Sequence, residues 1–490
     1  MNRARHRAPA AFGHGSAYDH PGPSGRWRWL IAISIVCAGS GCAHYQAAPL
    51  EPRHSAEEFA ARQLTDPQLR ELVTPLLPQA SAQWPPQRWN RAQLLAVALV
   101  RNPDLAVAHA EAQAALMHEV TAAEYPNPDL TLQSEYARHD PYAWLYGVSA
   151  SWLLRSGEQR RLEIDAARLD TLNAHLRLME QTWAVRRALT AALSEWESTR
   201  RRLSLLERLA AAQDRLVSLE RQRVKGGEDA PSELLVAERE RLDIERLRAE
   251  QRVAANVAQA AAAQALGVLP QGLDSLAISW PDWGEPAKVS DAQLDAAREQ
   301  ALLSRADLRV AIGEYAVAEK KLQRAIVRQY PQFVLQPGFY WDHGIAKFPF
   351  WLTFEVPFNA NRGEIADARA ARELAGRHML AVQADIYGEI AEAERAERIA
   401  RASEELAQRQ LQAAHTQEQQ AELALRLGAM DSLERTGAEI ISIRAELEVL
   451  AIREQLQASR NALEDVLHAP LTGPELALAS SFVPATAGGP

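Results

Sequence analysis

The sequence predicts a mainly α-helical protein with a small β part, built from two tandem copies of one unit: a helix, a pair of β-strands and a long coiled-coil hairpin. The 490 residues include only 24 glycines, 26 prolines and 6% aromatic residues, which is typical of proteins made of long helices. Residues 158–224 contain neither glycine nor proline, so we expect one helix of roughly 100 Å there. The third observation is an internal repeat.

The two halves of the chain carry the same landmarks in the same order. The offset between the copies stays between 201 and 206 residues along the whole repeat. Chance does not produce four matched landmarks at a nearly constant offset, so the repeat indicates a duplicated unit. The matched pairs are Asp104-Leu105 with Asp307-Leu308, Tyr125-Pro126 with Tyr330-Pro331, Gly157 with Gly363, and Gly227 with Gly428.

The N-terminus has the order of a secretory signal, predicted over residues 1–41. A basic stretch is followed by the apolar run Trp29–Ala38, which is too short to span a bilayer as a helix. Small residues directly before Cys42 resemble a bacterial lipobox, which makes Cys42 the expected lipid-attachment residue, carrying a covalent acyl chain such as palmitate. Ordinary cleavage near Ala43 is the alternative. Cys37 lies inside the apolar run, so no disulfide framework is expected.

The pattern of proline and glycine divides the rest of the chain. Prolines in the segment after Cys42 predict an extended arm with short helical turns, and those between the copies predict a linker outside the core. The expected parts are the arm 42–87; a first repeat 88–268, with strands at 129–154 and a hairpin tip at 225–231; the linker 269–290; a second repeat 291–470, with strands at 332–358 and a tip at 427–432; and a flexible C-terminal tail 471–490.

Within each copy, a helix of about 30 residues is expected to lead into the strands. The long helix that follows them turns back as an antiparallel coiled coil, because apolar residues keep the alternating four- and three-residue spacing of a coiled-coil seam. These residues are Leu205, Leu209, Ala212, Leu216 and Leu219 in the first copy, and Ile440, Ile443, Leu447 and Leu450 in the second.

The predicted strands alternate apolar and polar residues and are rich in aromatic side chains, which are sparse in the chain as a whole. Phe350, Leu352 and Phe354 share one face, and Trp351 and Thr353 share the other. This alternation, with aromatic residues near the ends, is typical of strands in transmembrane barrels; a soluble sheet packed on a helix is the alternative. The aromatic residues are Tyr136, Tyr142, Trp144, Tyr146, Trp152, Phe333, Phe339, Tyr340, Trp341, Phe348, Phe350, Trp351, Phe354 and Phe358.

Four strands are too few to close a barrel, since the smallest working barrels need about eight. An open sheet edge in lipid leaves backbone groups unpaired at a cost of several kcal/mol each. We therefore expect the chain to oligomerise. A dimer would supply eight strands and a filled interior, whereas a trimer would supply twelve and room for a channel.

The duplicated order of helix, strand pair and coiled-coil hairpin over residues 88–470 resembles the TolC-like outer-membrane efflux factors. The segment GEDAPSELLVAE, from Gly227 to Glu238, is similar to the cation-efflux, CzcC-like branch of that family. The resemblance implies a homotrimer with a twelve-stranded β-barrel in the outer membrane of a Gram-negative bacterium and a periplasmic α-helical tunnel. It also implies a periplasmic adaptor (membrane fusion) protein and an inner-membrane pump of the resistance-nodulation-division type as partners. The expected function is a passive exit duct for heavy-metal cations or toxic small molecules.

By the same resemblance, the hairpin tips are the expected adaptor-docking sites, and acidic residues near them could form a lumen constriction that favours cations. Each of these residues also fits a plain helix turn or a solvated helix face. The docking residues are Gly227, Ala230, Pro231, Leu234, Leu235, Arg426, Leu427, Gly428 and Leu433. The constriction residues are Glu228, Asp229, Glu418, Glu422 and Asp431.

Several functional classes are not supported by the sequence. The formal charge of −9 and the lack of a basic face after residue 42 argue against a nucleic-acid partner. The 13 histidines are scattered, so we expect no metal site, no cofactor and no enzyme. Two alternatives to an efflux duct remain: a periplasmic structural coiled-coil lipoprotein, and the outer-membrane duct of a type I protein secretion system.

Overall fold

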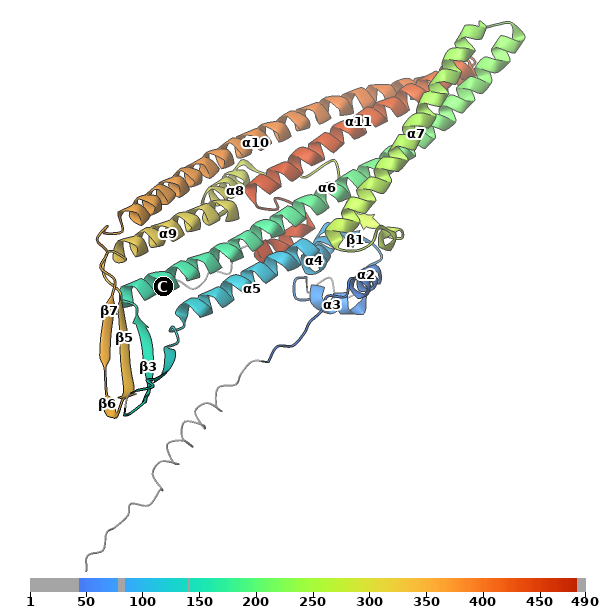
Figure 1. The fold of residues 1–490 in the computed structure, drawn as a ribbon. Coiled ribbons are helices and arrows are strands. Elements are labelled where there is room, and N and C mark those ends of the chain that lie inside the picture. The colour runs from blue at the N-terminus through green and yellow to red at the C-terminus, as the bar shows by residue number, and fades with distance from the viewer. Residues whose placement is uncertain (1–43, 78–83, 140, 483–490) are drawn as a thin grey trace, which may run out of the picture. The chain divides into compact units, whose positions relative to one another are not determined.

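The computed structural model describes residues 44–77, 84–139 and 141–482. The predicted signal peptide and Cys42 therefore lie outside the described residues. Residues 44–51 have no regular structure and are followed by α2 (Pro52–Ala60). From Glu57 onward, the chain forms one contiguous unit, whose arrangement is shown in Figure 1.

The first copy begins with a broken helix. Where the sequence predicted one helix of about 30 residues, Asn102 ends one helix and caps the next, accepting hydrogen bonds from the backbone N–H groups of Asp104 (2.9 Å) and Leu105 (3.2 Å). Pro103 follows in the first turn of the second helix, where its missing N–H costs nothing. The elements of this copy are α4 (Arg91–Arg101), α5 (Pro103–Ala123), β2 (Asp129–Tyr136), β3 (Trp144–Leu154), α6 (Gly157–Gly226) and α7 (Pro231–Leu266).

The second copy repeats this order, including the break, but where the sequence predicted a strand pair it has three strands, because β6 and β7 pair with successive parts of β5. Here the break falls at Arg305, whose guanidinium pairs with Asp307 (2.7 Å) and Glu389 (3.0 Å). The continuous helix predicted after residue 291 is therefore two helices. The elements are α8 (Asp291–Ser304), α9 (Ala306–Val327), β5 (Phe333–Asp342), β6 (Ile345–Lys347), β7 (Phe350–Phe354), α10 (Arg362–Arg426) and α11 (Ser432–Leu467).

Helices and strands of the two copies follow the same lateral order. Helices α5, α6, α9 and α10 pack on one another in that sequence (Figure 1). The strands attached to their ends pair antiparallel as β2-β3-β5, and β5 then pairs with both β6 and β7. The returning helices α7 and α11 both pack on α6. The predicted seams meet there, because Leu209 and Ala212 of α6 share a buried cluster with Ile440 and Ile443 of α11.

The predicted linker is part of the main core, which corrects the expectation that it lies outside. It contains η2 (Pro270–Leu273) and β4 (Ile278–Ser279), which pairs in parallel with β1 (Trp89–Asn90). Trp280 and Trp283 are 4% and 2% exposed and belong to the same buried cluster as residues of α4 and α6. The arm also joins this cluster, through Leu69 and Val73 of α3 (Pro67–Val73).

The described part of the C-terminal tail is also packed rather than flexible. It forms η3 (Pro474–Phe482), which buries Leu478 in the main core. Glu475 of η3 pairs with Arg186 of α6 at 2.6 Å, and Arg186 also pairs with Glu464 (2.5 Å) and Asp465 (3.0 Å) of α11. The Arg186 side chain is fully buried. This buried charge cluster therefore joins the tail, α11 and α6 at one point.

Among the described residues, no helix combines the length and the apolarity required to cross a lipid bilayer.

Candidate functional site

The strand sheet has one face that is almost entirely apolar. Side chains alternate along each strand, and directly paired residues share a face, so the register assigns every strand residue to one side. On the apolar face of β2, β3, β5 and β7, Ser134 is the one polar interruption. The face is made of Leu130, Leu132, Tyr136, Trp144, Tyr146, Val148, Ala150, Trp152, Leu154, Phe333, Leu335, Pro337, Phe339, Trp341, Phe350, Leu352 and Phe354.

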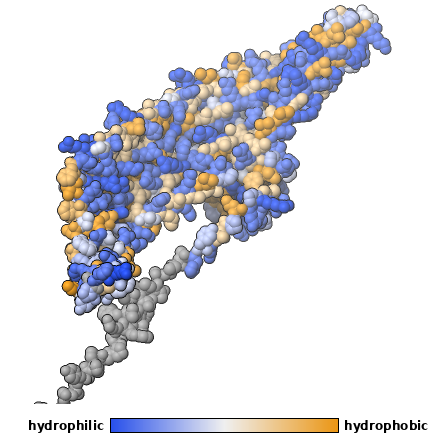
Figure 2. All heavy atoms as spheres, in the orientation of Figure 1, coloured by the Kyte–Doolittle hydropathy of each residue, from blue (hydrophilic) through white to orange (hydrophobic). Residues whose placement is uncertain are grey.

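This apolar face is uncovered within one chain. Leu132 is 77% exposed, Leu130 67% and Phe350 64%, and Figure 2 shows hydrophobic side chains gathered over part of the sheet. An apolar surface of this extent is larger than soluble monomers normally leave in water. A lipid environment or a covering partner is therefore required to stabilise it.

The opposite face is more polar and carries small residues, although Leu145, Leu153, Val334, Tyr340 and Trp351 also lie on it. Thr131, Gln133, Glu135, Ser149 and Ser151 lie on it by the same register. Near the middle of the sheet, a Cβ atom on Gly147 would lie 2.2 Å from Cδ1 of Tyr340, so only glycine leaves room for this ring. The two faces thus have the chemistry expected of the outer wall and the lumen wall of a membrane barrel.

The sheet and the helix layer are open at the same two flanks. Strand β2 is one edge of the sheet and follows α5, while β7 is at the other edge and leads into α10. The helices at these flanks also expose apolar residues, among them Met117 (57%) on α5 and Leu380 (52%) on α10. A contact that joins the β2/α5 flank of one copy to the β7/α10 flank of another is heterologous, and such contacts generate closed rings when the rotation allows it.

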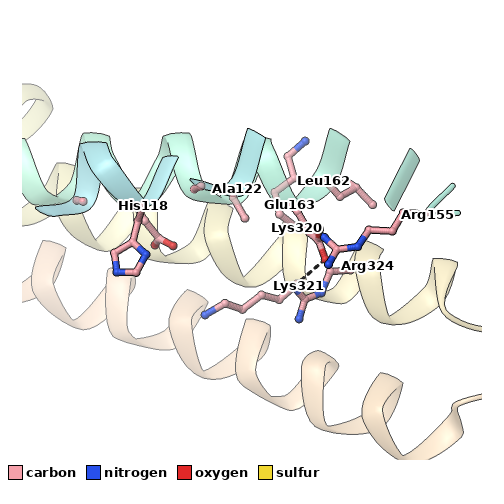
Figure 3. Close-up of a pocket in the computed structure, with 12 residues that line it drawn as sticks. His118, Ala122, Arg155, Leu162, Glu163, Lys320, Lys321 and Arg324 are labelled. Carbon is pink, nitrogen blue, oxygen red and sulfur yellow. Dashed lines mark hydrogen bonds and ion pairs between the residues drawn. The ribbon is translucent and has the colours of Figure 1, made fainter. Parts of the chain in front are cut away.

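A groove lies just below the sheet, between α5, α6 and α9 (Figure 3). Its volume is about 590 Å³, and Figure 3 shows Arg155 and Arg324 converging on Glu163. Their guanidinium groups lie 2.7 Å and 3.8 Å from the Glu163 carboxylate. Its lining residues include no serine, threonine, cysteine or tyrosine, so the groove offers no hydroxyl or thiol nucleophile. Its ion pairs instead tie the start of α6 to the second copy.

The first hairpin tip joins α6 to α7. Gly227 ends α6 in the left-handed region, with φ of 77°, and Pro231 occupies the first turn of α7, after the N-cap residue Ala230. Leu235 is 65% exposed, while Leu234 is partly buried. The predicted docking residues of this tip are therefore a helix reversal that leaves one large apolar side chain in solvent.

The second tip joins α10 to α11 and also reverses at a glycine with positive φ. Leu427 ends α10 and is 74% exposed, and Gly428 follows with φ of 74°. Arg426 is paired with Glu422 one turn earlier at 2.5 Å. Leu433, in the first turn of α11, is partly buried.

Two of the predicted constriction residues are held by one arginine. Asp229 accepts hydrogen bonds from the Arg223 guanidinium, including one of 3.1 Å from an NH2 group, and Asp431 lies 2.7 Å from the same guanidinium. The hydrogen bond from Arg223 holds the pKa of Asp229 below its usual range. Asp431 also caps α11, accepting from the Glu434 backbone N–H at 2.8 Å.

The remaining constriction residues are not gathered in this way. Glu228 is exposed in the first tip, whereas Glu418 and Glu422 lie on α10, Glu418 being partly buried. Their role in a constriction remains a prediction, since it depends on contacts between chains. For Asp229 and Asp431 the role in a constriction also stays a prediction, and Arg223 pairs with both of them within one chain.

The residues that complete the first tip were not predicted from the sequence. Besides Arg223, the structure brings Glu220 of α6 and Glu233 of α7 against Asp229, with one carboxylate oxygen of each within 4.8 Å of the others. The spacing of the acidic residues along the sequence does not by itself indicate this group, because Glu220 and Glu233 lie on opposite sides of the helix reversal. Knowing that α6 and α7 are antiparallel and that the turn centres on Gly227 would have been enough to pair these two positions.

Comparison with solved structures relates the fold to bacterial outer-membrane channels, although no protein-family model and no curated protein matches the sequence. The outer membrane protein VceC from Vibrio cholerae aligns with a TM-score of 0.64 at 15% identity, covering 78% of this chain and 97% of that one. The open state of the MtrE outer membrane channel from Neisseria gonorrhoeae aligns at 0.63 and 17%, covering 78% and 89%. The Campylobacter jejuni CmeC outer membrane channel aligns at 0.64 and 13%, covering 87% and 92%. The mainly helical architecture, with its few strands at one end, is therefore the fold of the TolC-like outer-membrane channels.

Proposed function

We propose that this protein is the outer-membrane channel of a tripartite efflux system in a Gram-negative bacterium. The observation that carries the proposal is the strand sheet, which has one uncovered apolar face, one polar face and two open edges. Three copies would supply a twelve-stranded barrel. The fold shared with outer-membrane channels supports this arrangement.

The long helices would form the periplasmic tunnel below the barrel. Helix α6 has 70 residues and α10 has 65, which correspond to about 105 Å and 98 Å at the rise of an α-helix. In the proposed assembly, the tips at Gly227 and Gly428 dock a periplasmic adaptor that receives substrate from an inner-membrane pump of the resistance-nodulation-division type. The chain itself would be a passive duct for heavy-metal cations or toxic small molecules, and Cys42 would carry the lipid anchor.

Membrane fractionation and mass determination test the assembly directly. The mature chain, expressed in a Gram-negative host, is expected in the outer-membrane fraction, and its detergent extract is expected to have the mass of a trimer that dissociates on heating. Mass analysis of the N-terminal peptide reports whether Cys42 is acylated. A water-soluble monomer or dimer would contradict the channel and favour the periplasmic coiled-coil lipoprotein.

Cysteine cross-linking tests the flank contact separately. Single cysteines at Thr131 on β2 and at Thr353 on β7 lie on the polar face at opposite edges of the sheet. A chain that carries both cysteines is expected to cross-link to other copies, giving covalent dimers and trimers. Cysteine pairs at neighbouring positions of β2 and β7 cover the possible registers between the two strands. Cysteines placed on two central strands, at Ser149 and Gln336, are the matched control and should give no link between chains. A trimer in which no edge pair cross-links would contradict this closure.

A further inference from the structure

The first hairpin tip contains an acidic group that the channel proposal does not use. It consists of Glu220 near the end of α6, Asp229 in the connecting turn and Glu233 in the first turn of α7. Three carboxylates at close range repel one another unless a cation or protons compensate them. Arg223 supplies a single positive charge, which it shares between Asp229 and Asp431.

The Glu220 side chain provides a second, independent observation. Only 8% of this residue is exposed, and its Oε2 atom is buried without a hydrogen-bond partner. A buried carboxylate oxygen with no donor costs free energy, and such oxygens in native proteins usually have a partner. Burial, and then the nearby Asp229 and Glu233, raise the pKa of Glu220. The tip therefore holds an oxygen that a proton or a cation would stabilise.

The space beside this oxygen is open to a small ion. Glu220 and Glu233 both line a groove of about 430 Å³ between α6, α7 and α11. An ion can thus reach Glu220 from solvent without unfolding the hairpin, and water can complete its coordination.

We propose that Glu220, Asp229 and Glu233 bind one divalent cation at the first hairpin tip, with Ca²⁺ as the preferred ion. All three donors are carboxylate oxygens, which hard cations select. Two oxygens bound to one Ca²⁺ ion lie at most about 4.8 Å apart at a ligand distance of about 2.4 Å, and the three donor atoms lie within 4.8 Å of one another, so one ion can contact all three. Ca²⁺ also accepts irregular sets of oxygen ligands, whereas Mg²⁺ demands near-ideal octahedral geometry.

The cation and Arg223 would then compete for Asp229. Because Arg223 also pairs with Asp431 of the second tip, an ion that takes over Asp229 leaves the arginine to Asp431. The site would therefore change how the two tips are tied together. It does not depend on the proposed channel function, since binding is measured on the isolated protein.

Isothermal titration of the full-length protein in detergent, freed of metal by chelation, tests the site with Ca²⁺ alone and then with Mg²⁺ alone. One saturable Ca²⁺ site per chain is expected, with weaker Mg²⁺ binding. Glu220→Gln keeps the shape of the side chain and should weaken Ca²⁺ binding about tenfold or more, because affinity follows the number of charged ligands. Glu233→Gln provides a second variant should the first not fold.

Two further variants give the matched comparison. Glu228 is an exposed carboxylate of the same tip that does not belong to the group, so Glu228→Gln should leave Ca²⁺ affinity within about twofold. Arg223→Gln removes the competing cation and should tighten binding. The absence of saturable Ca²⁺ binding up to about 10 mM, which is about tenfold above the weak end of the range for protein sites, would overturn the proposal. Equal losses in Glu220→Gln and Glu228→Gln would also overturn it.

Discussion

Replacing Arg186 with methionine should destabilise the protein far more than removing any exposed arginine. The Arg186 guanidinium is fully buried and contacts the carboxylates of Glu464, Asp465 and Glu475, of which Glu464 and Glu475 are only 2% exposed. Methionine fills similar space but leaves three buried acids without their main positive partner. Breaking a buried pair in this way costs about 3–5 kcal/mol, so the heat-denaturation midpoint should fall by several degrees.

The pH dependence distinguishes this mechanism from a simple packing defect. Burial raises the pKa of Asp465 to about 6 even beside Arg186, and loss of the arginine removes the partner that opposes this rise. The acids of the variant therefore take up protons as the pH falls, and the difference from the native protein should be smaller at pH 5 than at pH 8. Protease should also cleave the segment after residue 470 more readily in the variant, because Glu475 loses its anchor.

Arg208 provides the matched control, since it also joins α6 to α11. It pairs with Glu446 at 2.5 Å, but its side chain is 54% exposed, and exposed pairs contribute about 0–1 kcal/mol. Arg208→Met should therefore leave the midpoint nearly unchanged at both pH values. Equal effects of the two substitutions, or an Arg186→Met defect that does not depend on pH, would refute the reasoning.

Two further predictions concern the sheet and the end of α11. Gly147→Ala should reduce the yield of heat-labile oligomer, because the added Cβ would meet Tyr340 at 2.2 Å and separate β3 from β5. Gly157→Ala is the control and should not reduce this yield, because a Cβ there has no atom within 4 Å. Equal yields from the two variants would contradict the prediction. His468 is buried at the end of α11, stacked on Trp183, and burial lowers its pKa to about 4. The unfolded chain therefore binds the proton first as the pH falls from 6.5 to 4, and the native protein loses about 3 kcal/mol over that interval. In the His468→Asn variant, asparagine tolerates the left-handed backbone of this position, and the variant has no histidine whose protonation destabilises the native state. The heat-denaturation midpoints of the variant and the native protein should therefore converge as the pH falls towards 4. Parallel midpoint-against-pH curves would contradict this prediction.

The periodic parts of the fold could be predicted from the sequence. Long helices without glycine or proline have few alternatives, and the strand alternation assigned Leu352 and Thr353 to the faces where the register places them. The hairpin turns were predictable because Gly227 and Gly428 both adopt positive φ, which glycine tolerates best. The duplication then gave each of these assignments a second, independent copy.

Segments rich in proline and glycine were harder to predict, because local composition does not report burial. Trp280 and Trp283 follow the pattern of a loop, yet their rings pack under Arg91 and Arg201 at 4.5 Å. Glu475 lies in a tail that looks solvated, but its partner Arg186 is 289 residues away in the sequence. Both cases depend on contacts between distant segments, for which a single sequence has no periodic signal. The acidic group at the first tip is a different case, because pairing Glu220 with Glu233 requires only the antiparallel turn at Gly227 that the sequence predicts.

The duplicated architecture gives a physical reason for the proposed assembly of several copies. In the order α5-α6-α9-α10, the inner helix α6 is covered on both sides by α5 and α9, but α5 and α10 each have one flank without a neighbour in that order. The sheet ends at the same two flanks, with β2 beside α5 and β7 beside α10. Further copies joined flank to flank would pair the open strand edges and cover the exposed side chains of α5 and α10 in one step. A dimer closed in this way has eight strands and a filled interior, so the polar face that includes Gln133 and Glu135 is better accommodated by a ring of three, where it can face water.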